Sequence, residues 1–482
     1  MNDELKFKWH SVYGQILFDR KLMTAWTKVK SNKGAGGIDG ETLETYGLKI
    51  DENLENLLTR LRKKEYIPSP VRRVYIPKKD GSRRPLGIPN IEDRIVQQAL
   101  VNVLEPKFEE SIFHKWSCGY RPNVGAERVM QIIMWNIEQG FNHIYDCDIK
   151  GFFDNIPHKK LMKVLNKYIA DGTVLDMIWK WLKTGYMEEG KYNRSESGTP
   201  QGGVISPLLA NIYLNELDWM LDGLEGIRFV RYADDFLIFA QSKETIIKAE
   251  QATKKKLAEL GLEISVKKTR VIDFRHDDFD FLGFTFGHWR KRKKDGSPYY
   301  TAQPRKETWK DFKMKVKGKT KKHLTFSHEV WVNRVNPIIR GKVNYFLTIW
   351  KAIGANKQYG MRSRCFHNTF KNELLQIDGY IRRRLRVAMI HKHPSQRKGW
   401  AMTSKWSIGF FARIGLVSAF QYYYGQQYGH TTEDYIIYMK QKGRKKYENA
   451  LRKAKEKGQE YFTPDRNRKI ACVKRLANIN SN

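Results

Sequence analysis

The sequence predicts an α+β protein that contains more than one domain. Its 482 residues exceed what one compact core usually holds, and 41% of them are hydrophobic, which is enough for packed interiors. Between residues 71 and 286, helical spacings of apolar residues alternate with short strands and tight turns, which indicates helices packed around an antiparallel sheet. From residue 299 onward the pattern is mostly helical and rich in Lys and Arg.

The first 70 residues are expected to be helical. Leu22, Trp26 and Val29 fall on one helical face, and leucines between positions 54 and 61 fall on another. The Gly-rich segment 32–40 between them is predicted to be a flexible linker. It lacks the Lys-Ser/Thr pair that completes a nucleotide-binding P-loop.

Residues 71–89 are predicted to form a β-hairpin that turns at Gly81. The hairpin carries Arg72, Lys78 and Arg84. Two planar guanidinium groups and one ammonium could bind a triphosphate, although basic hairpins are also common on protein surfaces. The pattern alone leaves both interpretations open.

The next elements contain residues that could form a ligand-binding site. Helices are expected at 92–104, 161–169 and 174–182. A strand at 144–149 contains Asp148 near its end, and a loop at 197–203 leads into a helix. Glycines beside a helix N-terminus let a ligand approach the backbone, and the helix dipole favours anions there.

The segment 229–239 is predicted to be strand, tight turn and strand, with Asp234 and Asp235 at the tip. Two adjacent carboxylates repel each other, so they retain a proton or bind a cation, and oxygen ligands of this kind suit Mg²⁺. A solvated Asp-Asp turn is the alternative. A third carboxylate nearby would decide between them, and Asp148 is the candidate.

The remainder of the chain is assigned more coarsely. A helix at 243–260 is expected to end at Gly261 as its C-cap, and strands are expected at 264–274 and 279–286. Further helices are expected at 323–349, 367–390 and 441–460.

Charge and cysteine usage limit the class of protein. The net charge is +36, and residues 281–482 hold 45 Lys and Arg against 12 Asp and Glu, so a polyanion is the expected partner. The four cysteines form no C-x-x-C pair, which favours a reducing compartment without a zinc module. No signal peptide or membrane-spanning stretch is visible, so a cytoplasmic protein is expected.

Three carboxylates, one on a strand and two at a hairpin tip, can hold two Mg²⁺ ions about 3.5–4 Å apart. Such a pair supports in-line phosphoryl transfer without a His or Ser nucleophile. No catalytic His-Cys or Ser-His-Asp arrangement is apparent, so the carboxylate site is the preferred hypothesis.

Several motifs resemble those of reverse transcriptases, above all the reverse transcriptase/maturases encoded by bacterial group II introns. The strongest are Tyr-Ala-Asp-Asp at 232–235 and the segment 148–156. Further matches follow in order and spacing at 32–40, 76–89, 97–100, 117–122, 198–202 and 281–284. Together they cover roughly residues 20–290.

The resemblance implies a right-hand polymerase fold. Residues 1–70 would be an N-terminal extension and the start of the fingers, 71–300 the fingers and palm, and 301–390 an α-helical thumb or maturase domain. Residues 391–482 would be a basic C-terminal region that binds DNA. They lack the Cys and His pattern of the HNH endonuclease that fuller family members carry.

The resemblance also implies roles for single residues. Asp148 and Asp234 would ligate two Mg²⁺ ions with the Ile149 carbonyl, and Asp235 would complete the acidic cluster. The residues expected to contact the incoming deoxynucleoside triphosphate are Arg72, Lys78, Arg84, Phe153, Gln201 and Lys268. Among these, Phe153 would exclude a 2′-hydroxyl. The primer-positioning turn would be Phe281, Leu282 and Gly283.

The implied partners are an RNA template, a structured intron RNA and a DNA primer or target, with the choice between monomer and homodimer left open. Two alternatives remain: a related polymerase recruited to host defence or repair, and a splicing cofactor without polymerase activity. The intact set of three aspartates argues against the second alternative, because a pure RNA binder gains nothing from concentrated negative charge.

Overall fold

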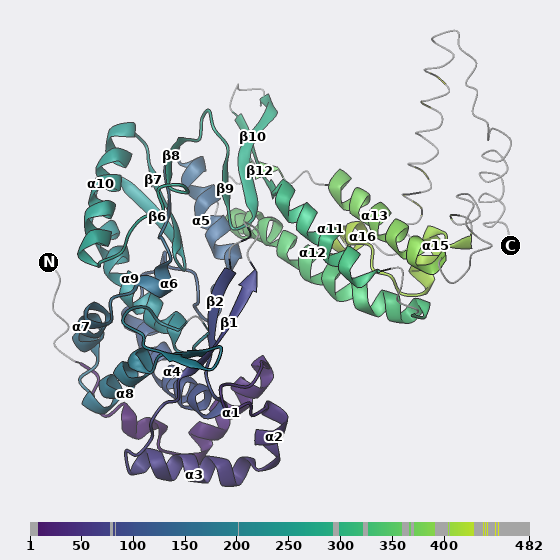
Figure 1. The fold of residues 1–482 in the computed structure, drawn as a ribbon. Helices are drawn as coiled ribbons and strands as arrows, with labels where there is room; N and C mark the ends of the chain where they lie inside the picture. The colour runs from purple at the N-terminus through teal and green to yellow at the C-terminus, as the bar shows by residue number, and fades with distance from the viewer. Residues whose placement is uncertain are drawn as a thin grey trace. The chain divides into compact units, whose positions relative to one another are not determined.

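The computed structural model describes residues 8–77, 81, 83–200, 202–292, 298–321, 326–358, 366–367, 371–390, 403 and 405–428, with a few isolated positions beyond. Lys78 and Gln201 therefore lie outside the described residues, as do most of 391–482 and most of the helix expected at 441–460. The chain divides into two compact units, 1–302 with 348–368, and 303–347 with 369–482 (Figure 1). Each unit is described by itself.

The central sheet of the first unit has the strand order β6-β7-β3-β8, and every neighbouring pair is antiparallel. Its strands are β3 (His143–Asp148), β6 (Ile227–Tyr232), β7 (Asp235–Ala240) and β8 (Arg270–Asp273). The predicted hairpin at 229–239 is confirmed as β6 and β7. These strands are rich in β-branched and aromatic residues, which fit a buried pleated surface.

Helices cover this sheet (Figure 1). The helices α5 (Ala126–Glu138), α9 (Ser206–Asp222) and α10 (Lys243–Glu259) pack on its strands, and α9 also packs on α10. The helix predicted at 243–260 is confirmed, and Gly261 follows it with a φ of +72°, as expected of a C-cap glycine.

A second sheet has the order β2-β1-β4-β5. Its strands are β1 (Val71–Pro77), β2 (Arg83–Ile88), β4 (Tyr186–Glu188) and β5 (Lys191–Asn193). The predicted hairpin of β1 and β2 is confirmed, but β4 joins β1 in parallel, which local periodicity did not indicate. The Arg73 guanidinium lies 3.8 Å from the centre of the Tyr186 ring and helps to attach β4 there.

Three sequence predictions for residues 264–304 need correction, and two of them concern a third sheet. It consists of β9 (Phe279–Phe281), β10 (Phe284–Arg292), β11 (Pro298–Pro304) and β12 (Phe366–His367). The single strand expected at 279–286 is divided by a two-residue turn, and the expectation of mostly helix from Tyr299 is wrong for β11. The strand expected at 264–274 is reduced to β8, because the Lys268 and Thr269 amides fold back onto the Ser265 carbonyl in a turn.

The N-terminal helices are η1 (Tyr13–Ile16), α1 (Asp19–Asn32), α2 (Leu43–Leu48), α3 (Ile50–Arg62) and α4 (Ile91–Ser111), and three more follow later: α6 (Phe152–Asn155), α7 (His158–Tyr168) and α8 (Gly172–Lys183). They share one hydrophobic core with the central sheet.

The Gly-rich segment 32–40 is not the free linker predicted. Asn90 accepts a hydrogen bond from the Ile38 amide at 2.9 Å, and the buried Arg94 guanidinium donates to the Ala35 carbonyl. A Cβ at Gly37 would overlap Asn90, so the glycine allows this close contact. The segment is therefore docked on the start of α4.

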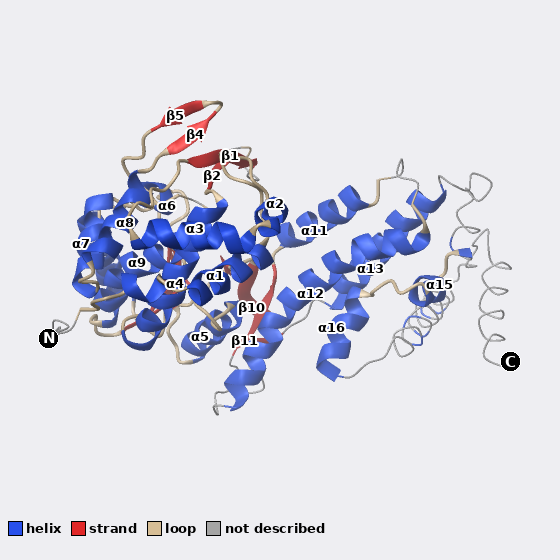
Figure 2. Ribbon diagram, turned by 90° about the horizontal axis from the view of Figure 1, so that it is seen from below, coloured by secondary structure: helices blue, strands red, loops and turns tan. Residues whose placement is uncertain are grey.

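The second unit is helical and contains α11 (Lys306–Lys319), most of α12 (His328–Gln358), α13 (Lys371–Ile390), α15 (Ile408–Arg413) and α16 (Ala419–Tyr428) (Figure 2). The α13 helix packs on both α11 and α16. The buried Asp378 on α13 accepts hydrogen bonds from the Ala419 and Phe420 amides at 2.7 and 3.3 Å, which caps α16 from a neighbouring helix. No described helix of either unit is long and apolar enough to cross a membrane.

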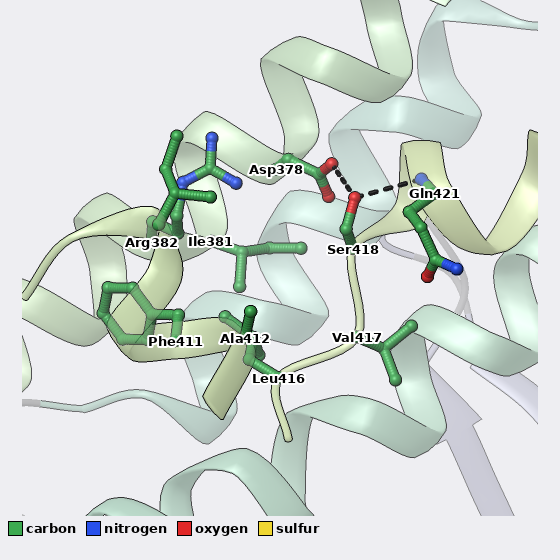
Figure 3. A pocket seen from close by; sticks show the side chains of 10 residues that line it. Asp378, Ile381, Arg382, Phe411, Ala412, Leu416, Val417, Ser418 and Gln421 are labelled. Atoms are coloured by element: carbon green, nitrogen blue, oxygen red, sulfur yellow. Dashed lines mark hydrogen bonds between the residues drawn. The ribbon is translucent and has the colours of Figure 1, made fainter. Parts of the chain in front are cut away.

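A small cavity lies beside this cap (Figure 3). It encloses about 30 Å³ and is lined by side chains that include Asp378, Arg382 and Ser418. The Ser418 hydroxyl donates to Asp378 and accepts from the Gln421 amide. A volume of this size is about that of one water molecule, so the cavity belongs to the packing of α13 on α16.

Candidate active site

The two central strands of the first unit bring three carboxylates to one edge of the sheet. Asp148 is the last residue of β3 and pairs in register with Asp235, the first residue of β7. Asp234 lies in the turn between β6 and β7, directly after Ala233, which has a φ of +60°. Residues separated by more than 80 positions in the sequence are thus neighbours.

The charge of this cluster is poorly balanced. Burial, followed by the charges of Asp234 and Asp148, raises the pKa of Asp235 to about 7, and Asp235 also shares a hydrogen bond with Asp148. Burial is the main cause that raises the pKa of Asp234 as well. Ionised carboxylates held this close need a proton or a cation between them.

Lys268 supplies part of the missing positive charge. Its ammonium lies 2.9 and 3.1 Å from the two carboxylate oxygens of Asp148, and this hydrogen bond raises the pKa of the lysine. The preceding turn is attached to the end of β3, because the Ser265 amide donates to the Asp148 carbonyl at 2.8 Å. The position of the Lys268 ammonium shows that positive charge is stabilised beside the three carboxylates.

The donor set is compatible with Mg²⁺. All its side-chain metal donors are carboxylate oxygens. The β-bridge between Ile149 and Ile264 is formed by hydrogen bonds of the neighbouring Asp148 carbonyl and Lys150 amide, so this bridge leaves the Ile149 carbonyl unused. Among the described residues, no group of three or more His, Cys, Asp or Glu side chains is arranged so that it could hold a metal ion. Mg²⁺ usually completes its shell with waters and substrate phosphates, so an incomplete protein ligand set fits this ion.

The structure describes only some of the residues predicted to contact the triphosphate. Arg84 on β2 is close enough to the cluster for its charge to oppose the rise in the pKa of Asp234. Arg72 on β1 has a buried Nε for which the described residues provide no hydrogen-bond partner. Lys78 and Gln201 lie outside the described residues.

Phe153 lies at the start of α6, half-buried, with its ring 5.3 Å from that of Phe152. Tyr120 faces it edge-on at 6.0 Å, and the charge of Asp234 contributes to the raised pKa of the Tyr120 phenol, after burial. Tyr120 is 48% exposed and has a φ of +56°. Sequence reasoning did not select this residue, although an aromatic residue between Gly119 and Pro122 was a usable signal.

The loop at 197–203 is held between β2 and α6. The Thr199 amide donates to the Phe153 carbonyl at 2.7 Å, and His158 lies 2.7 Å from the Gly198 carbonyl. The buried Gln97 accepts hydrogen bonds from the Val204 and Ile205 amides at 2.8 and 3.4 Å. Sequence reasoning noted Gln97 only as part of a motif, yet its carbonyl oxygen satisfies amides at the N-terminus of α9.

The predicted primer-positioning turn is the connection between β9 and β10. Phe281 pairs with Phe284, and both residues between them have positive φ, +44° at Leu282 and +77° at Gly283. Positive φ at both central positions is typical of a type I′ hairpin turn. The preceding residue, Asp280, contributes to the raised pKa of Asp146 on β3, which indicates that β9 lies near the central sheet.

Comparison with known proteins adds independent information. The family described as reverse transcriptase (RNA-dependent DNA polymerase) matches residues 76–286. Protein YkfC of Escherichia coli K12 is 33% identical over 306 residues, which cover 55% of this chain and 79% of YkfC. The group II intron-encoded protein LtrA of Lactococcus lactis subsp. cremoris is 41% identical over 210 residues, which cover 43% of this chain and 34% of LtrA.

The matched region thus spans about a third of the length of LtrA. Among solved structures, a chain of a partial Cas6-RT-Cas1–Cas2 complex aligns with a TM-score of 0.34 and 23% identity, over 52% of this chain and 43% of that chain.

Proposed function

Because this chain belongs to the group II intron-like reverse transcriptases, we propose that it extends a primer on an RNA template with deoxynucleotides. The catalytic residues in this proposal are Asp148, Asp234 and Asp235. The observation that supports it most is the pairing of Asp148 with Asp235 beside the Asp234 turn, where burial and then the charges of Asp234 and Asp148 raise the pKa of Asp235 to about 7.

Two Mg²⁺ ions bound there would supply the charge that activates an attacking hydroxyl and stabilises the leaving pyrophosphate. Asp148 and Asp234, with the Ile149 carbonyl, would hold these ions, and Asp235 would complete the acidic cluster. The deoxynucleoside triphosphate would lie between this cluster and the hairpin of β1 and β2, which carries Arg72 and Arg84. Its phosphates would contact Arg84 and Lys268, which already lie near the cluster.

The other assigned residues would shape the substrate site. Arg72 and Lys78 would contact phosphates, and Gln201 would line the nucleotide pocket. Phe153 would lie under the sugar and exclude a 2′-hydroxyl, and the turn formed by Phe281, Leu282 and Gly283 would position the primer end. Lys78 and Gln201 are assigned on their motifs alone.

The test is primer extension on poly(rA) annealed to oligo(dT), with dTTP and Mg²⁺. We expect Asp234→Asn to abolish incorporation, because it removes one ionic ligand while keeping the shape of the side chain. Asp273→Asn is the matched control, since Asp273 lies on β8 of the same sheet and pairs with Arg275 at 2.7 Å. Near wild-type activity in Asp234→Asn would reject the site assignment.

We also propose that the template in the cell includes a structured group II intron RNA, whose splicing the chain assists. This rests on the similarity to the group II intron-encoded protein LtrA and to the putative COX1/OXI3 intron 2 protein of Saccharomyces cerevisiae. The thumb assigned to 301–390 and the basic region 391–482 would bind RNA and DNA phosphates. Splicing assays with the intron RNA flanking the gene test this proposal. If no such RNA exists, the maturase role is wrong. The primer-extension assay tests the polymerase activity independently of this result.

A further inference from the structure

We propose that Arg231 is a positioning residue that, together with Asp218 and Asn211, fixes the backbone of the turn carrying Asp234. This inference rests on the proposed function, since it concerns the placement of a proposed metal ligand. Arg231 lies on β6, three residues before Asp234, and points into the protein and not toward the substrate.

The guanidinium of Arg231 uses four of its five N–H donors within the protein. Its Nε and Nη2 donate to the two carboxylate oxygens of Asp218 at 2.7 and 2.5 Å. Its Nη1 donates to the Asn211 side-chain oxygen at 3.0 Å and to the Ala233 carbonyl at 2.9 Å. Arg231, Asp218 and Asn211 are 1%, 0% and 1% exposed, so water does not compete for these bonds.

The Ala233 carbonyl is an informative partner, because the turn is under strain at this residue. Ala233 has a φ of +60°, a conformation that residues with a Cβ rarely adopt. It directly precedes two acidic residues that repel each other and Asp148. A turn with both features needs bonds from outside to keep one conformation.

A second contact holds the turn from the other side. The Asn211 side-chain amide donates to the Gly119 carbonyl at 2.8 Å, and a Cβ at Gly119 would overlap the Ala233 nitrogen. The segment leading to Gly119 runs beside β6, with the Cys118 amide bonded to the Arg231 carbonyl at 2.8 Å. Asn211 therefore links the Arg231 network to the segment that covers the turn.

The chemistry requires arginine at this position. A lysine ammonium could pair with Asp218, but it is a point charge and lacks the planar fork needed to serve Asp218, Asn211 and the Ala233 carbonyl together. A buried ion pair is often no more stabilising than well-packed apolar residues, so global stability alone does not account for this pair. The bond to the Ala233 carbonyl gives it a specific task at the site.

The first test compares Arg231→Lys with Arg60→Lys in the full chain. Arg60 also pairs with both oxygens of a carboxylate, that of Glu92 at 2.7 Å, and lies on α3, which is not part of the turn. We expect Arg231→Lys to bind template–primer as the wild type does and to retain its KM for dTTP. Turnover should fall by about 100-fold, the typical effect of misplacing a reacting group by about 1 Å, and more Mg²⁺ should be needed for half-maximal rate.

The second test separates positioning from stability. Glycine adopts positive φ without strain, so adding Ala233→Gly to Arg231→Lys should restore part of the missing turnover, and the melting temperatures of the two variants show how much of that change follows stability. The charge-free pair Arg231→Met with Asp218→Leu should fold, because no buried charge is left unpaired, and should show the same loss of turnover and the same rescue.

Hydrogen exchange of the peptide covering 230–238 provides a readout independent of catalysis. Exchange faster than in the wild type in Arg231→Lys, and unchanged in Arg60→Lys, supports the inference. Wild-type exchange and turnover in Arg231→Lys would overturn it, and so would a loss of turnover that follows thermal stability and is not rescued by Ala233→Gly. Failure of the proposed function is a different result: the wild type would then match Asp234→Asn in primer extension, whatever the exchange rates.

Discussion

In the proposed site, a proton on Asp235 and a divalent cation beside it would compete with each other. Its pKa is raised to about 7, mainly by burial and then by the charges of Asp234 and Asp148. At neutral pH without a divalent ion, the carboxyl group is therefore protonated in a large fraction of molecules. A bound cation would replace that proton, so metal binding should release protons and strengthen as the pH rises.

The raised pKa of Asp235 makes the folding stability depend on pH. The folded protein holds this proton more tightly than the unfolded chain, in which an Asp pKa is about 3.9. Without Mg²⁺, the free energy of unfolding should therefore fall as the pH rises from about 4 to about 7. Asp235→Asn should lack this component, and Mg²⁺ should raise the melting temperature of the wild type most above pH 7. Melting curves at several pH values with and without Mg²⁺ measure it; equal pH slopes for both proteins would contradict the raised pKa.

Phe153 supports a prediction about sugar selection. Its ring contacts those of Phe152 and Tyr120, with centroids at 5.3 and 6.0 Å, and these contacts would restrict it in the proposed position under the sugar. Phe153→Ala should raise the relative efficiency of ribonucleotide incorporation by about 10- to 100-fold, the range expected when a pocket loses part of an apolar wall. Tyr192→Ala, which removes an exposed ring on β5, is the control. If the ratio of kcat/KM for dTTP to kcat/KM for UTP were the same in Phe153→Ala and the wild type, Phe153 would not exclude the 2′-hydroxyl.

Among the connecting elements, the loop at 197–203 depends on close backbone contact. Gly202 has a φ of +116°, and a Cβ there would lie 2.6 Å from the Gly87 carbonyl oxygen of β2. Gly190 also has a positive φ, +79°, but a Cβ there would meet nothing within 4 Å. An alanine would therefore strain the backbone at both positions, but only at Gly202 would it also collide with a neighbouring strand.

We therefore expect Gly190→Ala and Gly202→Ala to share the cost of a positive φ, about 1–2 kcal/mol. Only Gly202→Ala should also displace the loop from β2, which would raise the KM for dTTP. Steady-state kinetics at saturating template–primer provide the measurement. If both variants raised this KM equally, the loop contact would have no part in nucleotide binding.

Local patterns predicted the elements whose partners are close in sequence. The β6–β7 hairpin, the hairpin of β1 and β2, and α10 with its Gly261 cap follow from apolar spacing and turn residues. Contacts between distant segments were not visible: β4 joins β1 across more than 100 residues, and Arg94 holds a segment that composition marked as a linker.

The same limit applies to the site. Its acidic residues were recognisable because their motifs are local, and the structure brings Asp148 and Asp235 together. Arg231 was missed because an arginine on a strand resembles a surface residue until its partner on α9 is known. Tyr120 was missed for a similar reason, since its neighbour Phe153 lies more than 30 positions away.

At the scale of the whole molecule, positive charge is concentrated after residue 280. On α11 of the second unit, Lys306, Lys310 and Lys317 are exposed and recur at intervals of four and seven, so they lie along one face of the helix. Such a row can follow the phosphates of a nucleic acid, and each neutralised phosphate releases counterions.

We expect replacement of these three lysines by glutamine to weaken template–primer binding at low salt. The slope of log K against log salt should become shallower by about 0.7–0.9 for each phosphate that the variant no longer neutralises. Lys243, Lys248 and Lys255 on α10 of the first unit are also exposed, and their replacement makes the same change in net charge. Titrations of a labelled RNA–DNA duplex at several salt concentrations compare the two triple variants. An equal change in slope for both would mean that total charge, and not the α11 face, determines duplex binding.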